Sequence, residues 1–155
     1  MKKLLLLFTL MVGVVASAQW ESGNFVDEFG DPSSRTYEQS RTTGTFSNSA
    51  TTNSSLIADV THQSYNGLLT FSMAEYSSSW AHFSSYGDYK IRIKLADGTQ
   101  LTGSLTPTSN QKSLYLYDTH AVAVAILSST SIVKAVIINR ERPSLKYVFT
   151  IKAKK

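Results

Sequence analysis

Apolar and polar side chains alternate most clearly in the segment 89–95. In order, its residues are Tyr89, Lys90, Ile91, Arg92, Ile93, Lys94 and Leu95. Strict alternation of this kind is typical of a half-buried β-strand. A three-residue loop over 96–98, with Gly98 in the left-handed conformation, sets Ile93 opposite Leu101 and keeps the apolar side chains on one face. A two-residue turn would mix the faces, so the pattern predicts a three-residue hairpin loop and a cationic second face.

A second hairpin is predicted from the segments 56–61 and 68–73. The dipeptide 66–67, Asn-Gly, is a strong two-residue turn signal, and it would pair His62 with Phe71. His62 then lies on the inner face near a strand end. We expect it to be packed there with a backbone or water partner rather than to bind a metal, since no His, Cys or carboxylate stands at metal-ligand spacing around it.

The remaining chain shows the same alternation of apolar and polar residues, with one exception. Further strands are predicted at 25–29, 35–40, 113–117, 131–139 and 145–151. The exception is 120–127, where alanines favour a short helix capped by Thr119, although the β-branched residues between them fit a strand. Segment 46–55 is polar and rich in turn residues, which predicts an exposed connection. Because 131–139 is apolar on both faces, we expect an inner strand or one covered by the helix.

Together these elements predict an all-β, mainly antiparallel fold. We expect a β-sandwich or a small barrel of about nine short strands, with one short helix near 120–127. The three prolines, Pro32, Pro107 and Pro143, fall between apolar runs, as turn residues do. Because the chain has no cysteine, no disulfide can support the fold, and the hydrophobic core must stabilise it alone.

Residues 1–18 have the pattern of a secretory signal peptide. Two lysines precede an apolar run over 4–15, and small residues follow it up to Ala18. We expect cleavage between Ala18 and Gln19, which leaves a single secreted β domain over 19–155 in the periplasm or outside the cell. As a helix the apolar run would span about 18 Å, short of the roughly 30 Å hydrocarbon layer. No transmembrane segment is therefore expected in the mature chain.

The net charge and the absence of known catalytic motifs argue against several classes of function. The formal net charge is +4, and Lys2 and Lys3 of the leader supply part of it, so nothing points to nucleic acid binding. The chain contains no Gly-x-Ser-x-Gly elbow, no His-Glu-x-x-His sequence and no phosphate-binding glycine loop, and its three histidines lie far apart. We therefore expect no cofactor and favour a binding domain over an enzyme.

The aromatic residues of 76–86 form the first candidate site. The candidate ligand-binding residues are Tyr76, Trp80, His82, Phe83 and Tyr86, and serines fill most positions between them. Flat rings among small polar side chains are suited to stacking on sugars or to gripping a partner protein, because they bring contact area at low entropic cost. Aromatic side chains of this kind are more often buried in the core. In that alternative Trp80 and Phe83 fold back into the core, while Tyr86 leads into the next strand.

A second, weaker candidate is the acidic turn formed by Asp27, Glu28 and Asp31. Carboxylates in a turn can bind a hard cation such as calcium, but this turn lacks the regular ligand spacing and the terminal bidentate Glu of a known calcium loop. We therefore prefer an acidic turn that faces solvent or pairs with Arg35 and Arg41.

One further run of residues lies near the start of the mature chain. It comprises Trp20, Phe25-Val26-Asp27-Glu28-Phe29-Gly30-Asp31-Pro32, Tyr37 and Gly44-Thr45-Phe46-Ser47-Asn48-Ser49-Ala50-Thr51. In these residues, and more faintly in the final hairpin, the chain resembles a group of small secreted bacterial proteins of uncharacterised function. The resemblance implies an exported β protein of one domain. It brings no assigned catalytic residues, and it implies that the acidic turn is a shared structural feature.

Three hypotheses follow for the function. The first is an exported, non-enzymatic binding domain whose partner is a glycan or a protein of the envelope or medium, contacted through 76–86. The second is a secreted hydrolase, which requires two of Glu75, His82, Asp88 and Asp118 to converge in one cleft. The third is a structural component of the cell envelope that assembles through an open sheet edge.

Overall fold

The computed structural model describes residues 20–154, so the predicted signal peptide and Gln19 lie outside the described residues. Within these described residues, ten strands and one helix form the fold. The strands are β1 (Glu21–Val26), β2 (Pro32–Ser47), β3 (Ser54–Gln63), β4 (Leu68–Glu75), β5 (Ser79–Trp80), β6 (Tyr89–Lys94), β7 (Gln100–Pro107), β8 (Leu114–Tyr117), β9 (Val133–Asn139) and β10 (Lys146–Ile151), and the helix is α1 (Ala121–Ser128). The predicted all-β, antiparallel class is confirmed.

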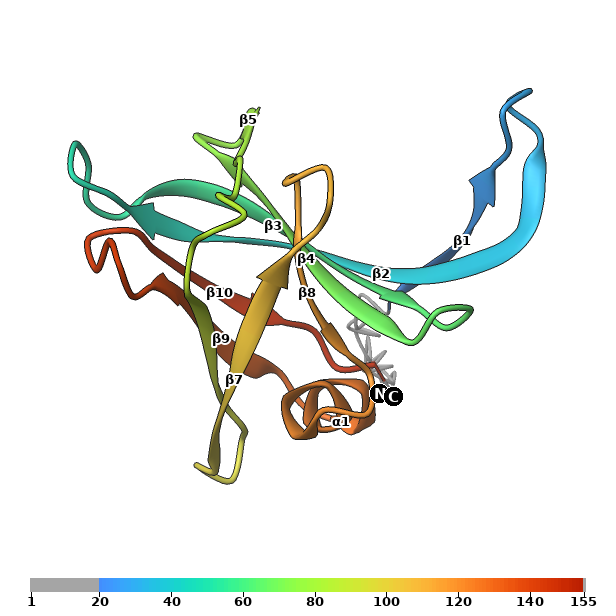
Figure 1. Ribbon diagram of the computed structural model, residues 1–155. Helices are drawn as coiled ribbons and strands as arrows, with labels where there is room; N and C mark the ends of the chain where they lie inside the picture. Colours follow the sequence, from blue (N-terminus) through green and yellow to red (C-terminus); the bar gives the residue numbers. More distant parts are fainter. Residues whose placement is uncertain (1–19, 155) are drawn as a thin grey trace, which may run out of the picture.

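The long strand β2 closes the sheet into a barrel. It pairs with β3 along one edge and with β10 along the other, so eight strands form a ring in the order β2-β10-β9-β6-β7-β8-β4-β3. The first half of β2 projects from this ring and pairs with β1, and the resulting hairpin forms an arm beside the barrel (Figure 1). Of the two predicted architectures, the barrel is therefore the one observed.

Apolar side chains fill the inside of the ring. Inward positions alternate with outward ones along the strands of the ring, as the sequence pattern predicts. An eight-stranded ring is just wide enough for side chains to fill it, so the barrel holds a packed core. Its largest fully buried side chains are Tyr147, Phe46, Phe71, Phe83, Leu56, Leu69, Met73, Ile91, Ile93, Leu114, Ile126 and Ile137.

The hairpin predicted from 89–105 is confirmed in its register. Ile93 pairs with Leu101 and Tyr89 with Leu105. Gly98 has a φ of 89°, the left-handed conformation that the three-residue loop requires. The cationic residues of β6 point away from the core, as expected.

The predicted register of the second hairpin is wrong by two residues. His62 pairs with Leu69 rather than with Phe71, because the chain turns over four residues, 64–67, instead of two. The backbone N–H of Asn66 donates to the carbonyl of Gln63 at 3.3 Å, which closes this longer turn. A shift of two leaves every side chain on its predicted face, so His62 still points inward.

The predicted exposed connection over 46–55 is also wrong in part. Strand β2 continues to Ser47 and β3 begins at Ser54, while Phe46 is 1 % exposed and belongs to the core. Only the residues between these strands connect them. The polar residues of this segment lie partly at outward positions of the two paired strands and partly in the turn. The local sequence does not distinguish these two kinds of position.

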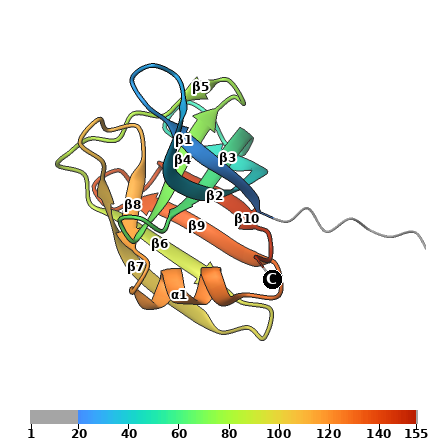
Figure 2. The same cartoon turned by 90° about the vertical axis from the view of Figure 1, so that its right-hand side faces the viewer.

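Helix α1 closes one end of the barrel beside β7 (Figure 2). Its cap is His120 rather than the predicted Thr119, since the His120 Nδ1 accepts a hydrogen bond from the Val122 N–H at 3.1 Å. Gly103 of β7 makes room for it, because a Cβ there would lie 2.8 Å from the His120 ring. The helix therefore packs against the barrel end and does not cover the outer face of β9.

Within residues 20–154, no helix has both the length and the apolar character needed to cross a bilayer.

Gly44 is the position where β2 passes closest to β10. A Cβ at this inward position would lie 2.8 Å from the Phe149 Cβ and would also meet the Val148 carbonyl oxygen. We expect Gly44→Ala to lower the free energy of unfolding by about 2 kcal/mol, because the strands must separate to admit the methyl group. Urea unfolding measures the change. The exposed neighbour substitution Thr43→Ala should change it by less than about 0.5 kcal/mol, and equal effects of the two variants would contradict this packing.

Candidate functional site

The structure separates the five candidate residues of 76–86. Phe83 is 1 % exposed and packs edge-on against Tyr89 in the core, with ring centroids 5.5 Å apart. Tyr86 is 90 % exposed, and the side chain of His82 also lies in solvent. Tyr76 packs edge-on against Phe46 over the end of the barrel. Only Trp80 lines a depression of the surface together with other polar side chains.

Trp80 is held in place by strand β5. Tyr76 and Ser77 adopt the left-handed conformation, with φ of 53° and 60°, and so reverse the chain sharply after β4. Trp80 then pairs with Ala74 of β4, and the N–H of Ala81 donates to the Met73 carbonyl at 2.7 Å. Backbone hydrogen bonds therefore fix a half-exposed indole on the outer face of the barrel, beside β4.

A polar groove runs from Trp80 across the outer faces of β4, β3 and β2. It consists of two adjoining depressions of about 390 and 460 Å³. The residues that line both are Gln39, Thr61, Ser72 and Ser113. All but Ser113 occupy outward strand positions, where their hydroxyl and amide groups face solvent rather than the core. We call this surface the polar groove.

The far end of the polar groove is aromatic. Phe25 of β1 and Tyr37 of β2 line it, with ring centroids 5.0 Å apart in an edge-on arrangement. Phe25 also packs edge-on against Tyr65 of the β3–β4 turn at 5.5 Å, which ties the arm to the barrel. Gly23 lies under the Tyr37 ring, since a Cβ there would be 2.6 Å from the ring. The groove thus has an aromatic side chain at each end.

One residue that lines the polar groove, Asp59, belongs to an ion pair. Asp59 is 5 % exposed and accepts hydrogen bonds from Arg41 Nε at 2.8 Å and Nη2 at 2.7 Å. These hydrogen bonds and the negative charge of Asp59 raise the pKa of Arg41 above its usual value. Because this bidentate pair neutralises the buried carboxylate, the floor presents polar groups without an uncompensated charge.

The sequence pattern contained part of this site. Asp59, Thr61, Gln63, Thr70 and Ser72 occupy the polar face of the second predicted hairpin. Alternation alone marks such residues as facing solvent. What it does not reveal is that aromatic rings lie at both ends of this face. The arm reaches the barrel through a contact between distant residues, Phe25 and Tyr65, and Trp80 is placed by an unusual left-handed reversal after β4.

The acidic turn has a structural role in the observed fold. Asp27 Oδ1 accepts hydrogen bonds from the backbone N–H of Phe29 at 2.9 Å and of Asp31 at 3.0 Å, which stabilises the β1–β2 turn. The predicted pairing with Arg41 is not formed, since Arg41 binds Asp59. Among residues 20–154, no three His, Cys, Asp or Glu side chains are arranged to hold a metal ion.

The four residues from which the hydrolase hypothesis needs two to converge have separate partners. Glu75 accepts a hydrogen bond from the Tyr147 hydroxyl at 2.8 Å, and Asp88 pairs with Arg140 at 3.2 Å. Asp118 contacts His62, while the side chain of His82 lies in solvent. None of the four is in contact with another, so no observed interaction between them supports this hypothesis.

A cluster of charged groups that sequence reasoning missed surrounds His62 at the barrel end. Its Nδ1 lies 3.4 Å from Glu38 Oε2 and its Nε2 lies 3.4 Å from Asp118 Oδ2. Lys154 Nζ pairs with Glu38 at 2.5 Å and lies over the Trp20 ring. His62 was predicted to be packed with a backbone or water partner. It is largely buried, and the side chains 3.4 Å from its ring nitrogens are Glu38, Asp118 and Lys154. These partners come from three distant segments.

This cluster makes the stability depend on pH. Burial alone would raise the pKa of Glu38, but hydrogen bonds from Lys154 and His62 outweigh it and lower the pKa below the ordinary 4.5. A carboxyl whose pKa is lowered by folding stabilises the fold above its unfolded pKa, and this contribution is lost as the pH falls through the folded value. We expect the free energy of unfolding to decline below about pH 4.5, and to decline less in Glu38→Gln.

Urea unfolding between pH 6 and pH 3 measures the effect. Glu28→Gln, which changes an exposed glutamate of the β1–β2 turn, serves as the control and should follow the wild-type profile. Identical pH profiles for the wild type and Glu38→Gln would contradict the assigned role of Glu38.

No family model, no curated protein and no solved structure matches this chain. Its proposed function therefore rests on the side chains of the groove itself.

Proposed function

We propose that this protein is an exported binding domain whose polar groove takes a neutral glycan chain. The observation that carries the proposal is the pair of aromatic ends, Trp80 at one and Tyr37 with Phe25 at the other, joined by a polar floor. Sugar rings present apolar faces that pack on aromatic rings, and their hydroxyl groups pair with amide and hydroxyl side chains. Export itself follows from the predicted signal peptide.

The floor of the polar groove favours a glycan over a protein partner. Protein interfaces depend on large apolar anchors that fill well-packed pockets. Here the shared floor is made of Gln39, Thr61, Ser72 and Ser113, which offer donors and acceptors but little apolar area. The Ser72 and Ser113 hydroxyls already bond each other at 2.6 Å, so the floor is partly ordered before a ligand arrives.

The charge of the floor favours a neutral glycan. The charged residues that line the two depressions are Asp59 and Lys112, and Asp59 is neutralised by Arg41 from beside the groove. A strongly anionic polymer would need several unpaired cations along its path, and the groove does not supply them. The neutral hexose and N-acetylhexosamine polymers are therefore the class that the groove fits.

A glycan array followed by calorimetry on the strongest oligosaccharide tests this assignment. We expect Trp80→Ala to weaken binding at least tenfold, because the indole supplies the stacking surface at one end. Gln39→Ala should weaken it less, since it removes one hydrogen-bonding amide. Tyr86→Ala is the matched control, because this 90 % exposed ring lies in the same segment but outside the groove.

Retained binding in Trp80→Ala, or equal losses in Trp80→Ala and Tyr86→Ala, would overturn the assignment of the polar groove. Circular dichroism and thermal melting of each variant establish that the fold is intact. Both substituted aromatic side chains are exposed, so neither substitution removes core packing.

The same site predicts a weak dependence on salt. Because the ligand is neutral and the floor pairs its own charges, raising sodium chloride from about 50 to 500 mM should change the affinity by less than about twofold. Calorimetric titrations at the two salt concentrations measure this. A tenfold loss of affinity at high salt would indicate an anionic ligand instead.

A further inference from the structure

The outer face of β6, β9 and β10 differs from the rest of the barrel in its charge. Its outward positions carry five cations and no carboxylate. The cations are Lys90, Arg92, Lys94, Lys134 and Lys146. Among the residues that the structure describes, only Lys90 of these five has a carboxylate within 4.0 Å, that of Asp88. We call this surface the cationic face.

Two of these cations are placed directly opposite each other. Lys94 of β6 and Lys134 of β9 form a cross-strand pair on the outer face. Like charges in this position repel and lower the stability of the sheet. Arg92 occupies the next outward position along β6 and is also exposed, so three positive charges gather at one end of the face. A bound anion would relieve this repulsion.

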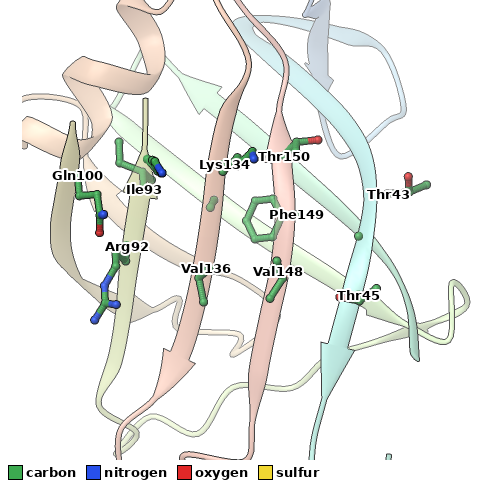
Figure 3. A pocket seen from close by; sticks show the side chains of 13 residues that line it. Thr43, Thr45, Arg92, Ile93, Gln100, Lys134, Val136, Val148, Phe149 and Thr150 are labelled. Atoms are coloured by element: carbon green, nitrogen blue, oxygen red, sulfur yellow. The ribbon is translucent and has the colours of Figure 1, made fainter. Parts of the chain in front are cut away.

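Apolar side chains occupy the centre of the cationic face. Val136 of β9 pairs with Val148 of β10, and Ile138 follows two positions further along β9. Of the two predicted alternatives for β9, the inner strand is the one observed, since β9 lies between β6 and β10, while α1 packs at the barrel end and leaves this face open. The valines lie in a depression of about 450 Å³ bordered by Arg92, Lys134 and the hydroxyl of Thr45 (Figure 3). Its walls are almost wholly apolar.

We propose that the cationic face is a second binding site, and that its occupant is a single-chain anionic amphiphile such as a fatty acid. The valine-lined depression receives the alkyl chain, and the cluster of Arg92, Lys94 and Lys134 binds the carboxylate. Burial of the chain removes apolar surface from water, and the carboxylate compensates the repulsion between Lys94 and Lys134.

The shape of the face favours a single molecule over a membrane surface. A protein that docks on a bilayer presents projecting apolar side chains that insert between lipids. On the cationic face Val136, Val148 and Ile138 are half-buried, and the two valines line a depression rather than a protrusion. A concave apolar surface with cations at its border fits one alkyl chain and one anionic group.

The cationic face is separate from the polar groove. The groove lies on the outer faces of β2, β3 and β4, and no residue that lines it also lines the valine-lined depression. Substitutions in one site therefore leave the other intact, which supplies matched controls for the two proposals.

Calorimetric and NMR titrations with dodecanoate below its micelle concentration test the proposal. We expect saturable binding with shifts at Val136 and Val148, and no binding of dodecyltrimethylammonium, which has the same chain and the opposite charge. The double variant Lys94→Gln/Lys134→Gln should weaken dodecanoate binding at least tenfold. Its melting temperature without ligand should be unchanged or higher, because the repulsion between the two lysines is removed. Trp80→Ala should bind dodecanoate as the wild type does.

Three outcomes would overturn this assignment. The first is equal affinity for the anionic and cationic amphiphiles, and the second is wild-type affinity in Lys94→Gln/Lys134→Gln. The third is binding to phosphatidylglycerol vesicles without binding to monomeric dodecanoate, which would indicate a membrane surface as the partner. A folded Val148→Thr variant with at least threefold weaker binding would support the valine-lined depression as the place of the chain, because it adds a hydroxyl at nearly constant volume.

Discussion

The structure depends on the double pairing of β2. Near Gly44 this strand lies between β3 and β10, and that position joins the two ends of an eight-stranded sheet into a ring. Closure separates an apolar inside from a polar outside and satisfies the backbone groups that an open sheet would leave at its edges. Since the chain has no cysteine, this packed ring must stabilise the fold without a disulfide.

Because side chains fill the interior, recognition has to take place on the outer surface. The barrel wall has two regions of different chemistry there. On β2, β3 and β4 the outward residues are hydroxyls and amides, and β5 and the arm add aromatic rings. On β6, β9 and β10 they are cations around valines. One closed sheet thus supports both proposals, a neutral glycan on one wall and an anionic amphiphile on the other.

The sequence predicted those features that depend on neighbouring residues, and it did not predict those that depend on contacts between distant segments. The register of 89–105 followed from alternation and from the conformation of Gly98, which are both properties of neighbouring residues. The predicted register of the second hairpin was wrong by two residues. A two-residue turn and a four-residue turn both keep the apolar side chains on one face, so the pattern could not distinguish them. The choice of a barrel and the burial of Phe46 depend on contacts between distant segments, which no local pattern encodes. The position of Trp80 depends instead on the left-handed conformation of Tyr76 and Ser77, two residues that rarely adopt it.

The central claim is that β2 closes the barrel, and NMR of uniformly labelled protein tests it most directly. The account predicts inter-strand nuclear Overhauser contacts from the residues around Gly44 to both Leu56 of β3 and Phe149 of β10, with slow amide exchange on both edges of β2. Contacts to β3 alone, with rapidly exchanging amides along the edge that should face β10, would show an open sheet and would contradict the account.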